Sequence, residues 1–292
     1  MLVVGLTGGI ASGKSTVSKI FSEYHHIPII DADLLAREVI EPGTSGFTTI
    51  VNHFGPDRIL DANGILDRAA LGEIIFNDPN ERKWLNGVIH PLVRREMVKR
   101  TVKYWLKGEW AVIVDVPLLI EAGMWKWVGE IVVVYVNEKL QLSRLISRPL
   151  PNSPPLTETQ AKSRISSQMS LSEKINYSTY VLDNSGTIKD LEVQIDKLVN
   201  KWKVSQGFGI GIPVIDGWWY KLCWLVPPVG LTAGLMVLIS RWMKYNFGGN
   251  KKGRRKGRGE VERNWKPEEI ELRERNGRPG GRRRRGGSIT DE

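Results

Sequence analysis

A chain of 292 residues can hold one or two domains, and its formal net charge of +10 is unevenly distributed. Residues 248–292 contain 15 Lys and Arg against 8 Asp and Glu, which leaves 27 against 24 on the preceding residues. This uneven distribution argues against interpreting the total charge as a nucleic-acid-binding surface over the whole chain. The single cysteine, Cys223, excludes an intrachain disulfide and is typical of a reducing compartment.

The chain opens with an apolar, strand-like run over residues 2–6, a glycine-rich loop and a helix-like stretch over residues 16–24. The loop, residues 8–15, reads Gly-Gly-Ile-Ala-Ser-Gly-Lys-Ser and fits the phosphate-binding pattern G-x-x-x-x-G-K-[ST]. Its glycines let backbone N–H groups point at a polyphosphate, to which the helix adds its N-terminal dipole. Lys14 supplies a charge to the β- and γ-phosphates, and Ser15 supplies a hydroxyl to Mg²⁺.

This phosphate-binding loop (P-loop) predicts a site for a nucleoside triphosphate and Mg²⁺; the alternative is a glycine-rich turn with an exposed lysine. The predicted nucleotide contacts are Gly8, Gly9, Ile10, Ala11, Ser12, Gly13, Lys14, Ser15 and Thr16. Because the loop begins at residue 8, a removable targeting segment would take the first strand with it. We therefore expect the protein to face the cytoplasm.

The second strand-like run, residues 27–30, ends in the acidic sequence Asp31-Ala32-Asp33. In parallel α/β sheets ligands bind at the carboxyl ends of the strands, so this pair is predicted to face the P-loop. One carboxylate can hold Mg²⁺ through water, and the other can accept a proton from an incoming hydroxyl. The alternative is that either aspartate only caps a helix over residues 34–39.

Apolar, β-branched runs alternate with segments of helical spacing up to about residue 204, which predicts a doubly wound α/β fold with a parallel sheet. The interval over residues 34–106 is long for one crossover and predicts an inserted helical lobe. The later strand-like runs are residues 111–116, 131–136 and 180–182, and the helix-like segments are 67–76, 91–106, 139–147 and 188–201.

Several short motifs follow the P-loop and the acidic pair in one collinear order. They are Glu41-Pro42-Gly43, Asp67-Arg68, Leu85-Asn86, His90-Pro91, Val116-Pro117-Leu118-Leu119-Ile120-Glu121, Arg144 with Arg148, Arg164-Ile165 with Gln168, and Asp183-Asn184-Ser185-Gly186. Together they make residues 1 to about 200 resemble the dephospho-CoA kinase family. The resemblance implies a kinase domain over residues 1–205 with a P-loop NTPase-type sheet, an acceptor-binding lobe (34–106) and a lid region (144–168).

The resemblance also implies an activity, which is transfer of the γ-phosphate of ATP to the 3′-hydroxyl of dephospho-CoA in the last step of coenzyme A synthesis. Asp33 then resembles the general base, and Asp31 is left for a water-mediated contact with Mg²⁺. The implied catalytic residues are Asp33, Lys14, Arg144 and Arg148, the implied acceptor contacts are Arg68 and His90, and Asn184 resembles a residue near the adenine.

Other readings stay open at this point. Pro91 can start a helix, the two arginines of residues 144–148 can form a solvated helix face, and Glu121 can be a cap or a sheet-end salt bridge. Another small-molecule or nucleoside-monophosphate-type kinase would carry the same P-loop, and so would a non-catalytic nucleotide switch. A GTPase-type Asn-Lys-x-Asp motif, which would favour the switch, is absent from the sequence.

Three features depart from the family pattern. Ala11 stands where the family often has glycine, residues 148–155 carry four prolines in the lid, and Ser178-Thr179 replaces an Ala-Asp pair. The prolines predict a stiffer lid than a short polar loop would give.

Residues 206–245 form a separate apolar segment, in which residues 222–240 carry no charge and tryptophans lie on both sides. Because a spanning helix needs ~20 mainly apolar residues, the segment predicts a transmembrane helix or a membrane-attached hairpin. The candidate membranes are the outer mitochondrial membrane, the endoplasmic reticulum and the lipid-droplet surface. The alternatives are a buried helix of the kinase domain and an extension without a role.

Residues 246–292 are rich in Gly, Arg, Lys and Glu and hold few apolar residues, which predicts a disordered basic tail. Trp265 is the only aromatic residue of residues 248–292, so the tail offers little surface for stacking on bases. We therefore favour an anionic lipid surface over nucleic acid as the partner of the tail, with simple solvation as the third reading.

Overall fold

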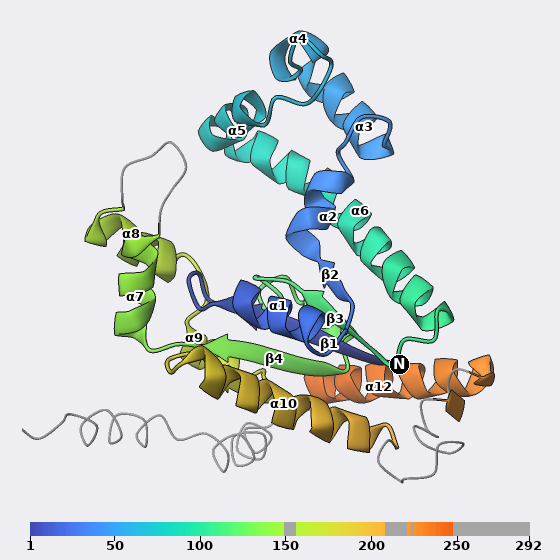
Figure 1. Cartoon of the computed structure of the whole chain (residues 1–292). Coiled ribbons are helices and arrows are strands. Elements are labelled where there is room, and N and C mark those ends of the chain that lie inside the picture. Colours follow the sequence, from blue (N-terminus) through green and yellow to red (C-terminus); the bar gives the residue numbers. More distant parts are fainter. Residues whose placement is uncertain (149–155, 208–220, 223–224, 248–292) are drawn as a thin grey trace, which may run out of the picture. The chain divides into compact units, whose positions relative to one another are not determined.

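The computed structural model describes residues 1–148, 156–207, 221–222 and 225–247. Within them, five parallel strands form one sheet in the order β2-β3-β1-β4-β5, which confirms the predicted α/β class (Figure 1). The strands are β1 (Leu2–Gly8), β2 (Ile29–Asp31), β3 (Ala111–Asp115), β4 (Glu130–Tyr135) and β5 (Tyr180–Asp183). Because later strands lie on both sides of β1, the sheet is doubly wound and its ligands are expected at the carboxyl ends of the strands.

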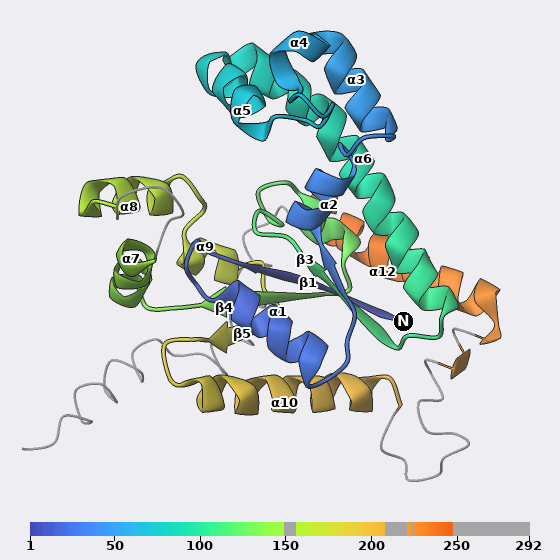
Figure 2. The same cartoon turned by 45° about the horizontal axis from the view of Figure 1, so that its top comes forward.

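Helices cover both faces of the sheet, because its strands are apolar on both sides (Figure 2). On one face, α1 (Lys14–Glu23) and α10 (Ile188–Ser205) bury Phe21 and Trp202 against the strands. On the other face, α2 (Ala32–Glu38), α6 (Pro79–Leu106) and α9 (Leu171–Ile175) bury Leu35, Met97 and Leu171. The sheet is therefore a buried platform that fixes the loops at its carboxyl edge.

A helical lobe is inserted between β2 and β3 and has an apolar core of its own. It contains α3 (Ser45–Phe54), α4 (Pro56–Ile59), α5 (Arg68–Asn77) and the N-terminal half of α6, seen at the top of Figure 1. Ile50, Ile59 and Leu71 are buried in this core. The sequence expectation of a helical insertion in this region is thus met by helices that pack on one another.

The interpretation of Pro91 as a helix start is wrong. The helix α6 begins at Pro79, where the Asp78 carboxylate caps it by accepting the backbone N–H of Asn80 at 2.7 Å. Its 28 residues make a rod of ~42 Å that joins the lobe to the sheet, and Pro91 lies inside it. Residues on both sides of Pro91 therefore share helix faces.

The segment predicted to form the lid, residues 144–168, includes the end of α7 (Glu138–Ser147) and all of α8 (Glu158–Ser166). Leu145 of α7 and Ala161 of α8 are buried together. The proline-rich stretch predicted to stiffen the lid falls mainly on residues 149–155, which lie outside the described residues. The structure therefore describes these two helices and not the connection between them, and the lid stays a prediction.

The described residues do not support the predicted transmembrane helix over residues 222–240. Helix α12 begins at Pro227 and ends at Phe247, so its uncharged part covers only residues 227–240, ~21 Å against a hydrocarbon core of ~30 Å. Among the residues that the structure describes, no helix is both long and apolar enough to cross a membrane. The predicted disordered tail, residues 246–292, lies almost entirely outside the described part of the chain.

Candidate active site

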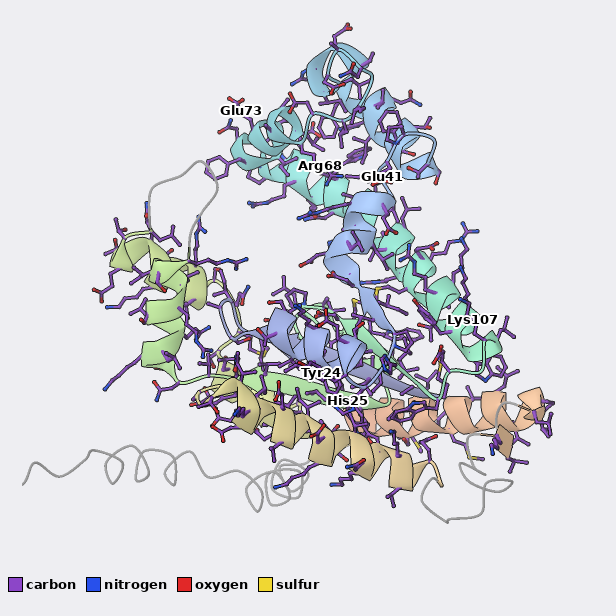
Figure 3. All side chains as sticks on the ribbon, in the orientation of Figure 1. Tyr24, His25, Glu41, Arg68, Glu73 and Lys107 are labelled. Carbon is purple, nitrogen blue, oxygen red and sulfur yellow. The ribbon has the colours of Figure 1, made fainter. Side chains whose placement is uncertain are left out.

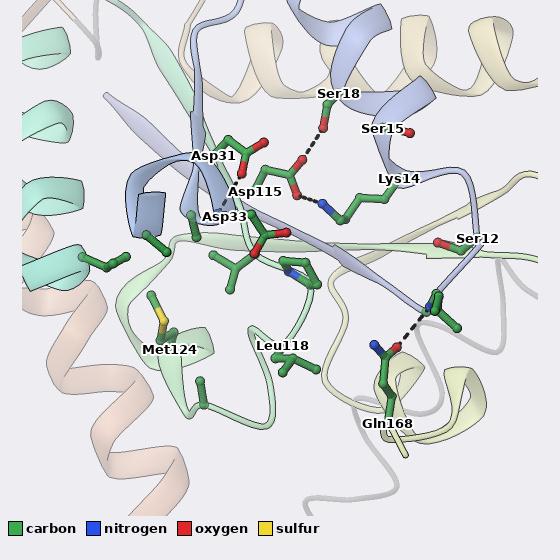
Figure 4. A pocket seen from close by; sticks show the side chains of 18 of the residues that line it. Ser12, Lys14, Ser15, Ser18, Asp31, Asp33, Asp115, Leu118, Met124 and Gln168 are labelled. Carbon is green, nitrogen blue, oxygen red and sulfur yellow. Dashed lines mark hydrogen bonds and ion pairs between the residues drawn. The ribbon is translucent and has the colours of Figure 1, made fainter. Parts of the chain in front are cut away.

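A cavity of about 1170 Å³ lies at the carboxyl ends of β1, β2 and β3 (Figure 4). Its walls come from the P-loop, the start of α2, one face of α6, the segment after β3 and the lid region. Predicted site residues that line it are Gly9, Ile10, Ala11, Ser12, Gly13, Lys14, Ser15, Asp31, Asp33, His90, Arg144 and Arg148. The lining residues do not include Gly8, Thr16, Arg68 or Asn184.

The P-loop turns sharply into α1 at Gly13, which has a φ of +87°. A side chain at this position would also collide with Asn184, because a Cβ on Gly13 would lie 1.9 Å from the Asn184 amide nitrogen. The buried side-chain amide of Asn184 donates to the carbonyl oxygen of Ser12 at 2.9 Å and so stabilises the conformation of the P-loop. The first N–H groups of α1 lack acceptors within the helix, which makes this end of α1 an anion site.

Ala11 has a φ of +58°, a left-handed conformation that glycine adopts without strain. We expect Ala11→Gly to raise the free energy of unfolding by about 1 kcal/mol, because a non-glycine residue is strained there. Urea denaturation with an unchanged m-value measures the difference. The same exchange inside α2, Ala36→Gly, should lower it by about 1 kcal/mol. An unchanged midpoint for Ala11→Gly would show that the loop accepts the Cβ without strain.

Lys14 is paired within the cavity, since its ammonium group forms an ion pair with the carboxylate of Asp115 at the end of β3 (Figure 4). The Ser18 hydroxyl donates to the other oxygen of Asp115 at 2.6 Å. Burial raises the pKa of Asp115, and the charge of Lys14 and the two hydrogen bonds oppose this rise. Our sequence analysis missed Asp115, although an apolar run ending in aspartate is the pattern of the metal-binding strand of P-loop NTPases.

Asp31 and Asp33 have different surroundings. Asp31 is the N-cap of α2, because its carboxylate accepts the backbone N–H groups of Asp33 and Leu34 at 2.8 and 3.1 Å. Asp33 is exposed in the first turn, lines the cavity, and its carboxylate has no hydrogen-bond or ion-pair partner among the described residues. The capping role thus belongs to Asp31, and Asp33 keeps a free carboxylate in the cavity.

The donor atoms near the P-loop fit a magnesium ion. Asp31 and Asp115 are register partners at the ends of β2 and β3, and the charge of Asp31 adds to the upward shift of the Asp115 pKa. The carboxylates of Asp31 and Asp115 line the same cavity as Ser15, and carboxylate and hydroxyl oxygens are hard donors of the kind that Mg²⁺ takes. In the described part of the chain no group of three or more His, Cys, Asp or Glu side chains is placed to hold a metal. Kinase sites commonly use one or two carboxylates together with substrate phosphates.

One face of α6 forms the wall opposite the P-loop. Its lining residues recur every three or four positions and are Asn86, Ile89, His90, Val93 and Arg94. Arg94 is a cation that our sequence analysis missed, and its spacing of four from His90 was the available signal. Arg68 begins α5 on the lobe (Figure 3), so its predicted contact with a ligand stays a prediction.

Arg144 and Arg148 line the cavity from the end of α7. A guanidinium nitrogen of Arg144 lies 3.9 Å from the point that a Cβ on Gly13 would occupy, so this side chain reaches the P-loop. Neither arginine forms an ion pair within the residues that the structure describes. Their charges favour an anionic ligand over a merely solvated helix face.

Comparison with known proteins decides the family. The dephospho-CoA kinase family model matches residues 2–190. This chain belongs to the dephospho-CoA kinase family. The dephospho-CoA kinase of Oceanobacillus iheyensis is 43% identical over 204 residues, which cover 70% of this chain and 99% of that protein. The dephospho-CoA kinase of Synechocystis is 48% identical over 195 residues, which cover 67% of this chain and 93% of that protein.

Solved structures agree with this family assignment. The dephospho-CoA kinase from Campylobacter jejuni matches with a TM-score of 0.54 and 26% identity, covering 68% of this chain and 96% of that structure. The protein TT1252 from Thermus thermophilus matches with a TM-score of 0.56 and 28% identity, covering 68% of this chain and 97% of that structure. The resemblance to the dephospho-CoA kinase family inferred from the sequence motifs is therefore confirmed.

Proposed function

We propose that this protein transfers the γ-phosphate of ATP to the 3′-hydroxyl of dephospho-CoA. The observation that carries the proposal is the unpartnered carboxylate of Asp33 in the same cavity as the P-loop and Lys14. A carboxylate without a competing partner can accept the proton of an alcohol, and a pure nucleotide switch has no need of one. The names of the relatives supply the acceptor.

The chemical step follows from the groups in the cavity. The 3′-oxygen attacks the γ-phosphorus while Asp33 takes the hydroxyl proton, and the bond from the γ-phosphorus to the β,γ-bridging oxygen breaks, so ADP leaves. Lys14 transfers its ion pair from Asp115 to the phosphates. Arg144 and Arg148 stabilise the charge on the equatorial oxygens of the transferring group. The protein thus contributes positioning and charge.

Within this proposal, Ser15 and Asp115 would hold Mg²⁺, and Asp31 would assist through water. The ion supplies neutralisation of the charge on the β- and γ-phosphates when bound. Asp31 and Asp115 end neighbouring strands in register, so their separation is fixed by the sheet.

The wall formed by α6 is the side from which dephospho-CoA would enter. His90 and Arg94 line this wall, and the lobe of residues 34–106 extends beyond it. Dephospho-CoA carries a diphosphate group, which basic side chains bind well. Arg68, on the lobe, is the further basic residue proposed to contact the acceptor, and Asn184 is proposed to lie near the adenine.

Residues 1–205 are proposed to suffice for the reaction, because every residue named in the cavity precedes the end of α10. We expect this fragment to convert dephospho-CoA to CoA with ATP, to stop when EDTA removes Mg²⁺, and to recover when Mg²⁺ is added back. Chromatographic detection of CoA measures the result. A folded fragment that binds ATP but phosphorylates nucleoside monophosphates instead would support the rival small-molecule kinase function.

The exposed face of α12 is proposed to lie on an anionic membrane surface without crossing it. Leu231, Leu235 and Ile239 are exposed and spaced by four residues, so they form an apolar stripe on one side of the helix. Residues 248–292, which follow the helix, carry a net excess of positive charge. An apolar stripe next to a basic segment is typical of peripheral membrane attachment.

We expect the full chain to pellet with vesicles containing phosphatidylserine, and residues 1–205 to stay in the supernatant. The double variant Leu235→Glu and Ile239→Glu should weaken this binding, because two charges replace the apolar stripe. Binding that the variant retains but that 1 M salt abolishes would assign attachment to the basic tail alone, since charges are then screened within ~3 Å. Absence of the full chain from the vesicle pellet would contradict the proposal.

A further inference from the structure

Lys174 in α9 is a fully buried charged residue that the proposed reaction does not use directly. Its side chain has no solvent exposure. The ammonium nitrogen lies 3.2 Å from the carbonyl oxygen of Gly8, 3.0 Å from that of Pro117 and 2.9 Å from a carboxylate oxygen of Glu121. A lysine ammonium has three N–H donors, so these three acceptors saturate it.

The three acceptors belong to two separate segments that adjoin the cavity. Gly8 is the last residue of β1 and leads into the P-loop, whereas Pro117 and Glu121 lie in the segment after β3. Leu118, between these two residues, lines the cavity. Lys174 therefore joins the P-loop to the segment after β3 by bonds from a single atom.

The same group of contacts includes the return from the lid region. The Glu121 carboxylate accepts the backbone N–H of Met169 at 3.3 Å. The neighbouring Gln168 accepts the backbone N–H of Ile10, in the P-loop, at 3.0 Å (Figure 4). The pair formed by Lys174 and Glu121 thus reaches three segments, namely the P-loop entrance, the segment after β3 and the chain that returns from α8.

We infer that Lys174 is a positioning residue that sets the P-loop relative to the segment after β3 and to the return from the lid region. The inference rests on the proposed function, because it concerns the same cavity. Apolar residues packed in place of a buried ion pair often give the same stability, so stability alone does not explain a buried lysine here. The three bonds from Lys174 to segments next to the cavity indicate that it fixes their geometry. A shift of ~1 Å in such a site can lower turnover by about 10²-fold.

The test compares Lys174→Met with the double variant Lys174→Met and Glu121→Gln. The single variant leaves the Glu121 carboxylate without its partner, so we expect a lower melting temperature and lower turnover. In the double variant the unpaired charge is gone, and the amide oxygen of the introduced glutamine side chain would still accept the N–H of Met169. We therefore expect the melting temperature to recover in part, while kcat stays about 10²-fold below wild type and ATP affinity stays weakened.

Both variants are measured at a temperature at which circular dichroism shows each to be folded. The matched control is Lys19→Met, which removes an exposed lysine from the ion pair with Glu23 on α1 and should leave kcat and ATP affinity unchanged. A double variant that regains wild-type kcat and ATP affinity together with its stability would overturn the inference. ATP affinity is titrated without acceptor, so this reading stands even if wild-type protein fails to make CoA, which would instead overturn the proposed function.

Discussion

We expect Asp33→Asn to lower kcat for CoA formation by about 10²–10⁴-fold, because it removes the proposed base while preserving the shape of the side chain. ATP affinity stays close to that of wild type, since the Asp33 carboxylate contacts neither the P-loop nor Lys14 among the described contacts. Steady-state kinetics and titration with ATP measure the two quantities separately.

A matched exchange at another exposed carboxylate controls for the general effect of losing a charge. Glu23→Gln, at the end of α1, breaks only an exposed pair with Lys19 at 3.8 Å and should leave kcat unchanged. If Asp33→Asn turns over like wild type, the hydroxyl proton is accepted elsewhere and Asp33 is a residue of the first turn of α2 and nothing more.

Lys14→Ala is expected to weaken both quantities. Its charge acts on bound phosphates as well as on the transition state, so kcat should fall by at least ~10²-fold and the Kd for ATP should rise. ATP affinity distinguishes this variant from Asp33→Asn, because only the lysine variant is expected to lose it. Lys19→Ala on the next turn of α1 serves as the control, since that lysine is exposed. Normal ATP affinity in Lys14→Ala would mean that the nucleotide phosphates lie elsewhere.

Local sequence patterns predicted those parts of the site that consist of residues close together in the sequence. The P-loop, the Asp31–Asp33 pair and the runs at residues 111–116 and 131–136 depend on spacing within a few residues, and the structure has them in place. The role of Lys174 could not be predicted from local patterns, because its three partners lie between 53 and 166 residues away in the sequence. The sequence left two roles for Glu121, a helix cap or a salt bridge at the end of the sheet. Its ion pair with Lys174 shows that it forms the salt bridge.

Two expectations that the structure does not support relied on single local signals. A proline was used to place the start of α6, and an uncharged run was used to place a membrane span. In α6 the capping by Asp78 and the packing of Leu85 and Val93 carry the helix through Pro91. In α12 the helix starts at Pro227, five residues into the uncharged run, so the spanning length is never reached. Capping and tertiary packing decide where α6 begins, and neither is visible in a single local pattern.

The pair between Lys14 and Asp115 has a consequence for nucleotide selectivity. The ion pair with Asp115 orients the ammonium group of Lys14 in the cavity. When the phosphates of ATP bind Lys14, the Asp115 carboxylate loses its cationic partner and faces the negatively charged phosphates. It is only 3% exposed, and it keeps the hydrogen bond from Ser18. Metal-free ATP therefore meets an electrostatic penalty that its magnesium complex relieves, and the protein should discriminate between these two forms at the binding step, before any chemistry occurs.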